Sequence, residues 1–144
     1  MATGLDLLVG SWRVVSIKYL FSDTGESVEP FGPNPEGRMV LAPGGRIMFL
    51  FTRFSRHPPM NDVDRVALFS GMAAYTGTVR LDGPGRFITT VDLSWNPAYG
   101  GEQLRLFTLV DDILTIRTPE MTVPMFPGRV HVGELVFNRE HRAL

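Results

Sequence analysis

Four side chains of the sequence have the chemistry to move a proton or to stabilise a negative charge. The carboxylate of Asp92 and the imidazole of His131 could accept a proton, and the phenol of Tyr75 could donate one. Arg105 keeps its charge and presents a planar fork of donors. We name these four as candidate catalytic residues for an acid–base reaction such as an isomerisation, a cyclisation or an elimination.

Each of these residues also has a purely structural interpretation. An ion pair between Asp92 and Arg105 would fix two strands without catalysis, because a buried charge needs a partner. His131 could sit at a solvated strand start, and Tyr75 could simply pack at a rim. The residue types leave both interpretations open.

Other chemistry has no support in the sequence. Cysteine is absent, which excludes disulfides, thiolate catalysis and cysteine-based metal sites. The three histidines, His57, His131 and His141, have no metal-binding spacing. Phosphate-binding glycine loops and the nucleophile elbow of hydrolases are also missing. We therefore expect no metal and no cofactor.

The composition is that of one globular domain, which we expect to cover residues 1–144. Hydrophobic residues make up 44% and charged residues 20%, as in folded rather than disordered chains. The net charge of −1 argues against a nucleic-acid partner, because nucleic-acid-binding domains are usually basic. The sequence has no apolar run of ~20 residues and no good signal peptide, which predicts a cytoplasmic protein without membrane contact.

The elements that must position the candidate residues are short strands. The 15 glycines and 11 prolines gather in clusters, and the segments between them are rich in Val, Ile, Leu, Phe and Thr. The predicted strands are Trp12–Phe21, Arg38–Ala42, Arg46–Arg53, Tyr75–Leu81, Arg86–Ser94, Gln103–Val110, Leu114–Thr118 and His131–Arg139. A short helical turn is predicted at Gly4–Val9. A helix is predicted at Asp62–Ala74, with Asn61 or Asp62 as its N-cap.

The connections predict a barrel with one closed and one open end. Tight turns alternate with long loops along the chain. The tight turns are residues 43–45, 82–85 and 111–113, and the long loops are residues 22–37, 54–74, 95–102 and 119–130. In an up-and-down meander, the long loops all lie at one end and form a mouth. The predicted fold class is therefore all-β, an eight-stranded up-and-down antiparallel barrel, a size that holds one small ligand.

The two ends of the predicted barrel carry a matching pair of residues. Gly10-Ser11-Trp12 opens the first strand and Arg139 ends the last, so both lie at the closed end. The guanidinium of Arg139 can then cover the indole of Trp12 as a barrel floor. A core tryptophan and an unrelated surface arginine are the alternative. This pair resembles the G-x-W motif and the terminal arginine of lipocalins.

The rest of the chain resembles more closely the bacterial and fungal lipocalin-like domain family of the calycin group. The similar stretches are Gly10–Ser16, Phe31–Gly37, Ala74–Gly77, Ser94–Pro97, Glu102–Arg105, Leu114–Thr115, Thr118–Pro119 and Leu135–Phe137. The resemblance implies a barrel that binds apolar small molecules or catalyses cofactor-free reactions, in some members within secondary metabolism. Thr89 and Thr90 stand where such proteins often carry a histidine, so the resemblance supplies no histidine base there.

Strand alternation and the resemblance together predict the side chains that face the cavity. An inward Trp12 also turns Lys18 inward, because successive side chains alternate between faces. The Gln-x-Arg pair that recurs in the family implies an inward Arg105, which makes Asp92 on the neighbouring strand its expected partner. The predicted ligand-binding residues are Lys18, Arg53, Ser94, Gln103, Phe107, Leu135 and Phe137.

The loops at the predicted mouth are unusually apolar. Their apolar residues are Met60, Phe69, Met72, Met121, Val123, Met125 and Phe126. Methionine adapts its shape, so these loops could form a lid over an apolar ligand. Exposed apolar surface is also typical of an interface, here a homodimer. The sequence leaves both interpretations open.

These observations predict a protein that binds a small, mainly hydrophobic, oxygen-bearing molecule of polyketide or terpenoid type. An apolar cavity below polar side chains would hold such a molecule and orient its oxygen atoms. One hypothesis adds a cofactor-independent acid–base reaction. The second is a non-catalytic carrier or sensor, and the third is an interaction module with a filled barrel. The sequence does not decide whether the protein is an enzyme, because a fold implies no reaction.

Overall fold

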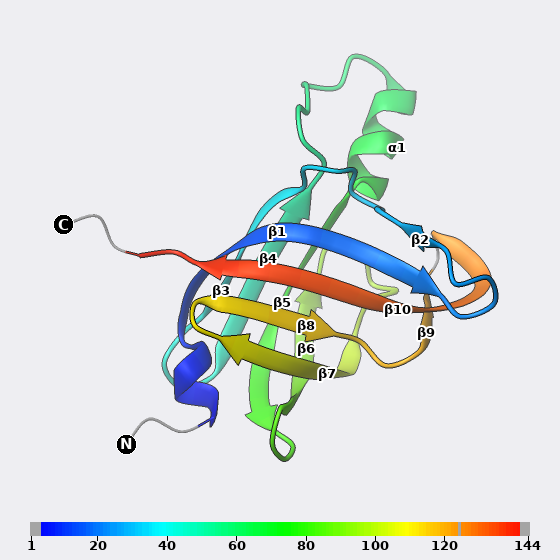
Figure 1. Cartoon of the computed structure of the whole chain (residues 1–144). Coiled ribbons are helices and arrows are strands. Elements are labelled where there is room, and N and C mark those ends of the chain that lie inside the picture. Colours follow the sequence, from blue (N-terminus) through cyan, green and yellow to red (C-terminus); the bar gives the residue numbers. More distant parts are fainter. Residues whose placement is uncertain (1–3, 124, 142–144) are drawn as a thin grey trace.

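The computed structural model describes residues 4–123 and 125–141. Its main feature is a closed antiparallel barrel of eight strands (Figure 1). The barrel strands are β1 (Gly10–Phe21), β3 (Glu36–Leu41), β4 (Arg46–Thr52), β5 (Met72–Leu81), β6 (Arg86–Ser94), β7 (Gly101–Val110), β8 (Ile113–Arg117) and β10 (Phe126–Arg139). Each strand pairs with its neighbour, and β1 pairs with β10 to close the ring. The predicted eight-stranded up-and-down barrel is confirmed.

Shorter elements lie at the two ends of the barrel. The 3₁₀ helix η1 (Gly4–Leu8) lies at one end, whereas the long connections carry β2 (Ser27–Val28), α1 (Asp62–Ser70) and β9 (Met121–Val123) (Figure 1). The connections from β3 to β4, from β5 to β6 and from β7 to β8 are tight turns, as the sequence predicts. Within residues 4–123 and 125–141, no helix has the length and apolar character needed to cross a membrane.

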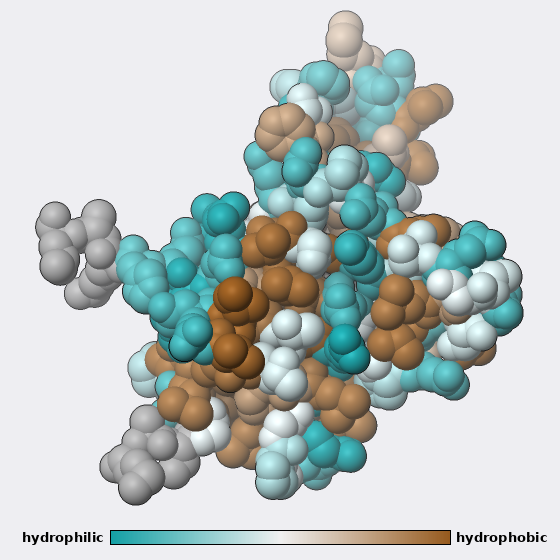
Figure 2. All heavy atoms as spheres, viewed as in Figure 1, coloured by the Kyte–Doolittle hydropathy of each residue, from teal (hydrophilic) through white to brown (hydrophobic). Residues whose placement is uncertain are grey.

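Helix α1 begins where the sequence predicts and ends earlier. The Oδ1 atom of Asn61 accepts a hydrogen bond from the N–H group of Asp64 at 2.9 Å, so Asn61 is the N-cap. The predicted helix continues to Ala74, but the residues from Met72 onward pair with β4 and extend the sheet instead. No residue of α1 is buried. Figure 2 shows apolar atoms among hydrophilic ones on this part of the surface.

The closed end of the barrel joins η1, β1 and β10. Trp12 is fully buried, and its Nε1 donates a hydrogen bond to the carbonyl oxygen of Leu8 at 2.9 Å. The guanidinium carbon of Arg139 lies 4.2 Å from the centre of the indole. Its terminal nitrogens donate hydrogen bonds to the carbonyl oxygens of Leu7 and Val9. Trp12 and Arg139 are thus in contact and tie the helical turn to the barrel.

Two β-bulges interrupt the alternation of side chains. In β1, the pairing with β10 shifts between Val14 and Ser16. Beyond this shift Ile17 and Tyr19 face the cavity. In β6, the pairing with β5 skips Asp92. A bulge adds one residue to a strand and so reverses the alternation beyond it, which changes the set of side chains that reach the inside of the barrel.

Candidate functional site

A cavity of about 260 Å³ occupies the inside of the barrel. Its walls are mainly apolar side chains at the inward positions of different strands, among them Met39, Ile47, Phe87, Ile116 and Phe137. A concave, mostly apolar space with a few polar groups is typical of a small-molecule site. The filled-barrel alternative does not describe this protein.

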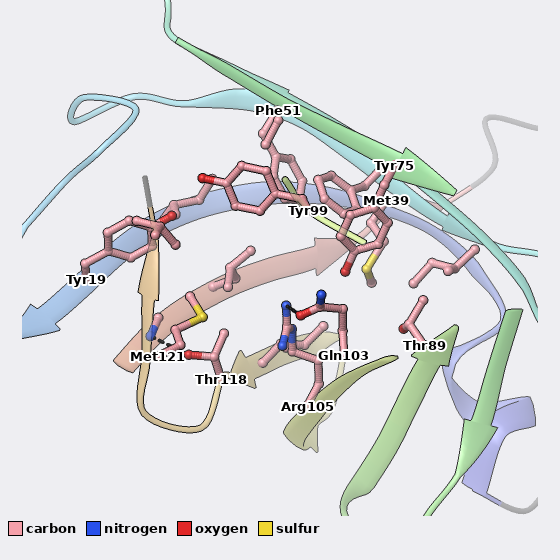
Figure 3. Close-up of a pocket in the computed structure, with 18 of the residues that line it drawn as sticks. Tyr19, Met39, Phe51, Tyr75, Thr89, Tyr99, Gln103, Arg105, Thr118 and Met121 are labelled. Atoms are coloured by element: carbon pink, nitrogen blue, oxygen red, sulfur yellow. Dashed lines mark hydrogen bonds between the residues drawn. The ribbon is translucent and has the colours of Figure 1, made fainter. Parts of the chain in front are cut away.

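Gln103 and Arg105 bring polar groups into the middle of this cavity (Figure 3). Both side chains face inward from β7. The Nη2 atom of Arg105 donates a hydrogen bond to Oε1 of Gln103 at 3.3 Å, and its Nη1 donates to the carbonyl oxygen of Leu104 at 2.8 Å. Gln103 in turn donates from Nε2 to the carbonyl oxygen of Gly100 at 2.8 Å. This last bond orients the amide so that its oxygen faces the guanidinium.

The Arg105 guanidinium keeps donors for a ligand. An arginine offers five N–H hydrogens, and the two hydrogen bonds just described use two of them. Among the described residues that line the cavity there is no aspartate or glutamate. Arg105 therefore brings a positive charge without a carboxylate partner into an apolar space, where an anionic or carbonyl oxygen would bind it strongly.

Tyr75 lines the same part of the cavity from β5. Its ring meets the ring of Phe49 edge-on, with 4.1 Å between the ring centres. Burial raises the pKa of the Tyr75 phenol, and the charge of nearby Arg105 opposes part of that rise. The phenol therefore keeps its proton at neutral pH and can donate a hydrogen bond to the same ligand oxygen as Arg105.

Thr89 and Thr90, which stand where the resemblance leads one to expect a histidine, face opposite sides of the barrel wall. Thr89 is fully buried in the cavity wall, opposite Gln103 on the neighbouring strand. Its hydroxyl has no hydrogen-bond partner among the described residues. Thr90 is exposed on the outer face. Neither threonine brings a titratable side chain into the cavity.

Tyr19 and Tyr99 form the outer end of the cavity (Figure 3), and Trp95 lines it beside them. Burial, together with the proximity of Tyr99, raises the pKa of Tyr19 to about 12. Burial also raises the pKa of Tyr99. Trp95 stacks on Tyr99 with 4.9 Å between ring centres, and its Nε1 donates to the carbonyl oxygen of Phe69 in α1 at 3.1 Å. Helix α1 thereby helps to hold the aromatic mouth.

A second cavity of about 280 Å³ adjoins the first at the mouth. The two cavities share Tyr19, Trp95 and Tyr99 in their walls. Most of the apolar mouth residues line one of the two cavities, namely Phe69, Met72, Met121, Val123 and Met125. They take the positions that a lid would take. Met60 is exposed, and an interface with a second copy stays a prediction.

The expected pair of Asp92 and Arg105 is wrong. Asp92 is exposed on the outer face of the barrel, where its carboxylate accepts a hydrogen bond from Nη1 of Arg46 at 2.7 Å. The bulge in β6 makes Asp92 the extra residue of its strand, and the residue opposite Arg105 is Phe87. Asp92 therefore lies outside the cavity that contains Arg105.

Lys18 and His131 also lie outside the cavity wall. The bulge in β1 turns Lys18 outward, opposite Glu134. His131 is fully buried rather than solvated, because β10 begins before it, at Phe126. Its ring lies 4.4 Å from the ring of Tyr19, measured between centres, and it supports that tyrosine from behind.

The remaining predicted ligand-binding residues divide into two groups. Leu135 and Phe137 line the cavity. Arg53 lies beyond the end of β4 in a separate pocket beside α1, Ser94 donates its hydroxyl hydrogen bond to a backbone carbonyl, and Phe107 packs in the core. The structure therefore brings Gln103, Arg105 and Tyr75 together with the two apolar residues, and separates the others from them.

The sequence interpretation missed the tyrosines at the mouth. Alternation counted from Trp12 predicts that Tyr19 points outward. The bulge in β1 reverses the alternation, so Tyr19 points inward instead. Tyr99 belongs to the connection between β6 and β7, where no periodicity applies. The spacing of Trp95 and Tyr99 in one short loop was the available signal, because large aromatic side chains in a mouth loop commonly pack over a cavity.

Comparison with models of protein families gives a match over most of the chain. A family model described as a lipocalin-like domain matches residues 9–139. That stretch contains all eight barrel strands and the side chains of the cavity. None of the curated proteins matches the chain.

Proposed function

Because the chain belongs to the lipocalin-like domain family, whose barrels suit small molecules, we propose that it binds a small, mainly hydrophobic molecule carrying an acidic or carbonyl oxygen. The observation that carries this proposal is Arg105, a charged side chain with free donors inside an apolar cavity. Tyr75 adds a phenol beside it, and Gln103 holds the guanidinium in place. Molecules of polyketide or terpenoid type combine the required apolar body with such an oxygen.

Two dyes of similar shape and different charge test this proposal. 8-Anilinonaphthalene-1-sulfonate is an aromatic anion, and N-phenyl-1-naphthylamine is its uncharged counterpart. Fluorescence titration should give tighter binding of the anion. Arg105→Met should weaken binding of the anion by about 10–100-fold, because a hydrogen bond to a charged group contributes ~1.5–3 kcal/mol. Binding of the neutral dye should stay within about twofold, because the apolar walls are unchanged.

The matched control is Arg46→Met, which removes the same charge from the outer face of the barrel. It should leave both dyes unchanged. Equal affinity of the wild-type protein for both dyes, or an Arg105→Met variant that binds the anion as before, would refute the role of Arg105.

A cofactor-independent isomerisation, cyclisation or elimination is the second candidate function. One observation favours it, namely that Arg105 and Tyr75 lie side by side and would stabilise an enolate oxygen. Against it, Asp92 and His131 lie outside the cavity, and a raised pKa makes the Tyr75 phenol a weaker acid. Binding without catalysis is therefore the function that the geometry supports best.

Deuterium exchange separates the two candidates. The bicyclic ketone 2-tetralone exchanges its α-hydrogens through an enolate, and NMR in D₂O follows the exchange. Faster exchange with the wild-type protein than with Arg105→Met and Tyr75→Phe would support catalysis. If the wild-type protein and both variants exchange the α-hydrogens of the bound ketone at the same rate, the protein acts as a carrier or sensor.

A further inference from the structure

We propose that Tyr19 and Tyr99 form a second oxygen-binding subsite at the mouth, so that the ligand carries an oxygen function at each of its two ends. This inference rests on the proposed function and deepens it. The first oxygen is the acidic or carbonyl oxygen at Arg105. The second is a hydroxyl or carbonyl oxygen at the opposite end of a ring system or rigid apolar body.

The position of the two phenols supports this inference. Tyr19 comes from β1 and Tyr99 from the connection between β6 and β7, and both line the inner and the outer cavity. In Figure 3 the two phenol oxygens lie near one another at the far side of the cavity from Thr89. A ligand whose first oxygen is held by Arg105 and whose body extends toward the mouth reaches these two groups.

The hydrogen-bonding state of the phenols gives a second argument. Burial raises the pKa of both groups, and no hydrogen bond to another described residue contributes to either shift. Each hydroxyl therefore has an O–H donor and acceptor lone pairs in a partly dry space. Neither phenol oxygen is among the buried side-chain atoms without a hydrogen-bond partner, so both stay accessible from the cavity. A ligand oxygen can therefore reach them and bond them.

Both rings are held in place before any ligand binds. Tyr99 stacks on Trp95, which is itself anchored to α1 by its indole nitrogen. The ring of Tyr19 packs against the rings of His131 and Phe126, at 4.4 Å and 5.9 Å between centres. A preorganised donor pair of this kind favours ligands that place an oxygen at the matching distance from the first one. This explains why the buried His131 is useful without touching a ligand.

Calorimetric titration with three pairs of acids tests the inference. The parent acids are benzoic acid, 2-naphthoic acid and biphenyl-4-carboxylic acid. Their partners carry a hydroxyl at the far end: 4-hydroxybenzoic acid, 6-hydroxy-2-naphthoic acid and 4′-hydroxybiphenyl-4-carboxylic acid. In the pair of matching length, the hydroxyl should tighten binding by about 3–10-fold, the value of one neutral hydrogen bond.

The double variant Tyr19→Phe/Tyr99→Phe should abolish this gain, so that the two acids of a pair bind with equal affinity. The matched control is Tyr75→Phe, which removes the phenol at the Arg105 end and should weaken both acids of a pair equally. Phenylalanine keeps the ring packing, and circular dichroism with thermal unfolding verifies that each variant is folded. If the double variant unfolds, the single variants Tyr19→Phe and Tyr99→Phe show which phenol bonds the hydroxyl of the acid.

The outcomes separate this inference from the proposed function. If the parent acids bind through Arg105 but no hydroxylated partner binds more tightly, the second subsite is refuted and the first stands. If the hydroxyl still tightens binding in the tyrosine variants, the second subsite is also refuted. If no acid binds, or Arg105→Met has no effect on any of them, the proposed function fails and the second subsite fails with it.

Discussion

Two arginines of this barrel, Arg139 at the closed end and Arg105 in the cavity, have opposite surroundings. Arg139 at the closed end stacks on Trp12, donates to two backbone carbonyls, and has its Nε 3.1 Å from the carboxylate of Asp112. Arg105 in the cavity bonds a neighbouring amide and a backbone carbonyl, and among the described residues it forms no ion pair. One guanidinium has a carboxylate partner and an aromatic ring beneath it, and the other has no carboxylate partner among the described residues.

The difference separates the part of the molecule that stabilises the fold from the part that binds. At the closed end the guanidinium bonds a carboxylate and two backbone carbonyls of the protein, so these contacts contribute to the free energy of unfolding. In the cavity Arg105 uses two of its five N–H hydrogens within the protein, and the others are held in position without a partner among the described residues. Such groups stabilise little by themselves and become useful only when a ligand arrives.

Removing the indole from the closed end should give the largest effect on stability. Trp12→Ala should lower the free energy of unfolding by roughly 3–5 kcal/mol, because it leaves a cavity in place of a fully buried aromatic ring. Urea unfolding followed by circular dichroism measures this. Removing the mouth indole with Trp95→Ala is the comparison and should cost much less. A loss below about 1 kcal/mol for Trp12→Ala would contradict the role of the closed end.

Arg139→Met should have the next largest effect on stability. It keeps the aliphatic stem and removes three donors and the charge over the indole, so we expect a loss of ~2–4 kcal/mol in the free energy of unfolding. Arg139→Lys keeps the charge but loses the planar set of guanidinium donors. Its free energy of unfolding should therefore lie between those of the wild-type protein and Arg139→Met. Ligand binding should be unchanged in both variants as long as they are folded, since the floor lies away from Arg105.

Alkaline pH should destabilise the cavity end selectively. The pKa of Tyr19 is about 12 in the folded protein and ~10 in an unfolded chain. Between these values the folded state holds a proton that the unfolded state releases, so stability falls as pH rises, by ~2–3 kcal/mol in all. Below pH ~10 the contribution is complete and constant.

The variant Tyr19→Phe tests this assignment. It should flatten the loss of stability between pH ~10 and ~12, while Tyr75 and Tyr99, whose pKa values are also raised, account for what remains. All three tyrosines of the chain line the cavity. A slope that persists unchanged in Tyr19→Phe would assign the alkaline transition to another group.

Arg105→Met should give the smallest effect on stability, and in the opposite direction from Arg139→Met. A partly buried charge without a carboxylate partner costs free energy, so its removal should leave stability unchanged or raise it by up to about 1 kcal/mol. The same substitution should abolish the preference for anionic ligands. A clear loss of stability would show instead that Arg105 holds strands together.

The barrel and its closed end could be predicted from the sequence because they depend on local signals. Tight turns of glycine and aspartate set the strand ends, and Trp12 with Arg139 sets the closed end. These features do not depend on the exact register of any strand. A strand that is one residue longer or shorter leaves the topology unchanged.

The site could be predicted only in part because inward and outward positions do depend on register. Arg105 and Gln103 lie on β7, which has no bulge, and their orientation is as expected. Lys18 and Asp92 were misplaced by bulges in β1 and β6. A bulge inserts one residue without a clear sequence signal and inverts the assignment beyond it. Tyr99 was missed because its place depends on tertiary packing of a loop.

The pairing of β1 with β10 has a consequence for the order in which the protein folds. The groups that meet there, such as Val9 and Arg139, are 130 residues apart, so closing this seam carries the largest loop entropy in the barrel. Hairpins such as β3–β4 and β7–β8 can form early, whereas the seam forms late and slows refolding. Until it forms, β1 and β10 are free sheet edges that can pair with other chains. Protection from aggregation therefore arrives in the same step as the barrel floor, and variants that weaken this seam should give a lower yield of soluble protein.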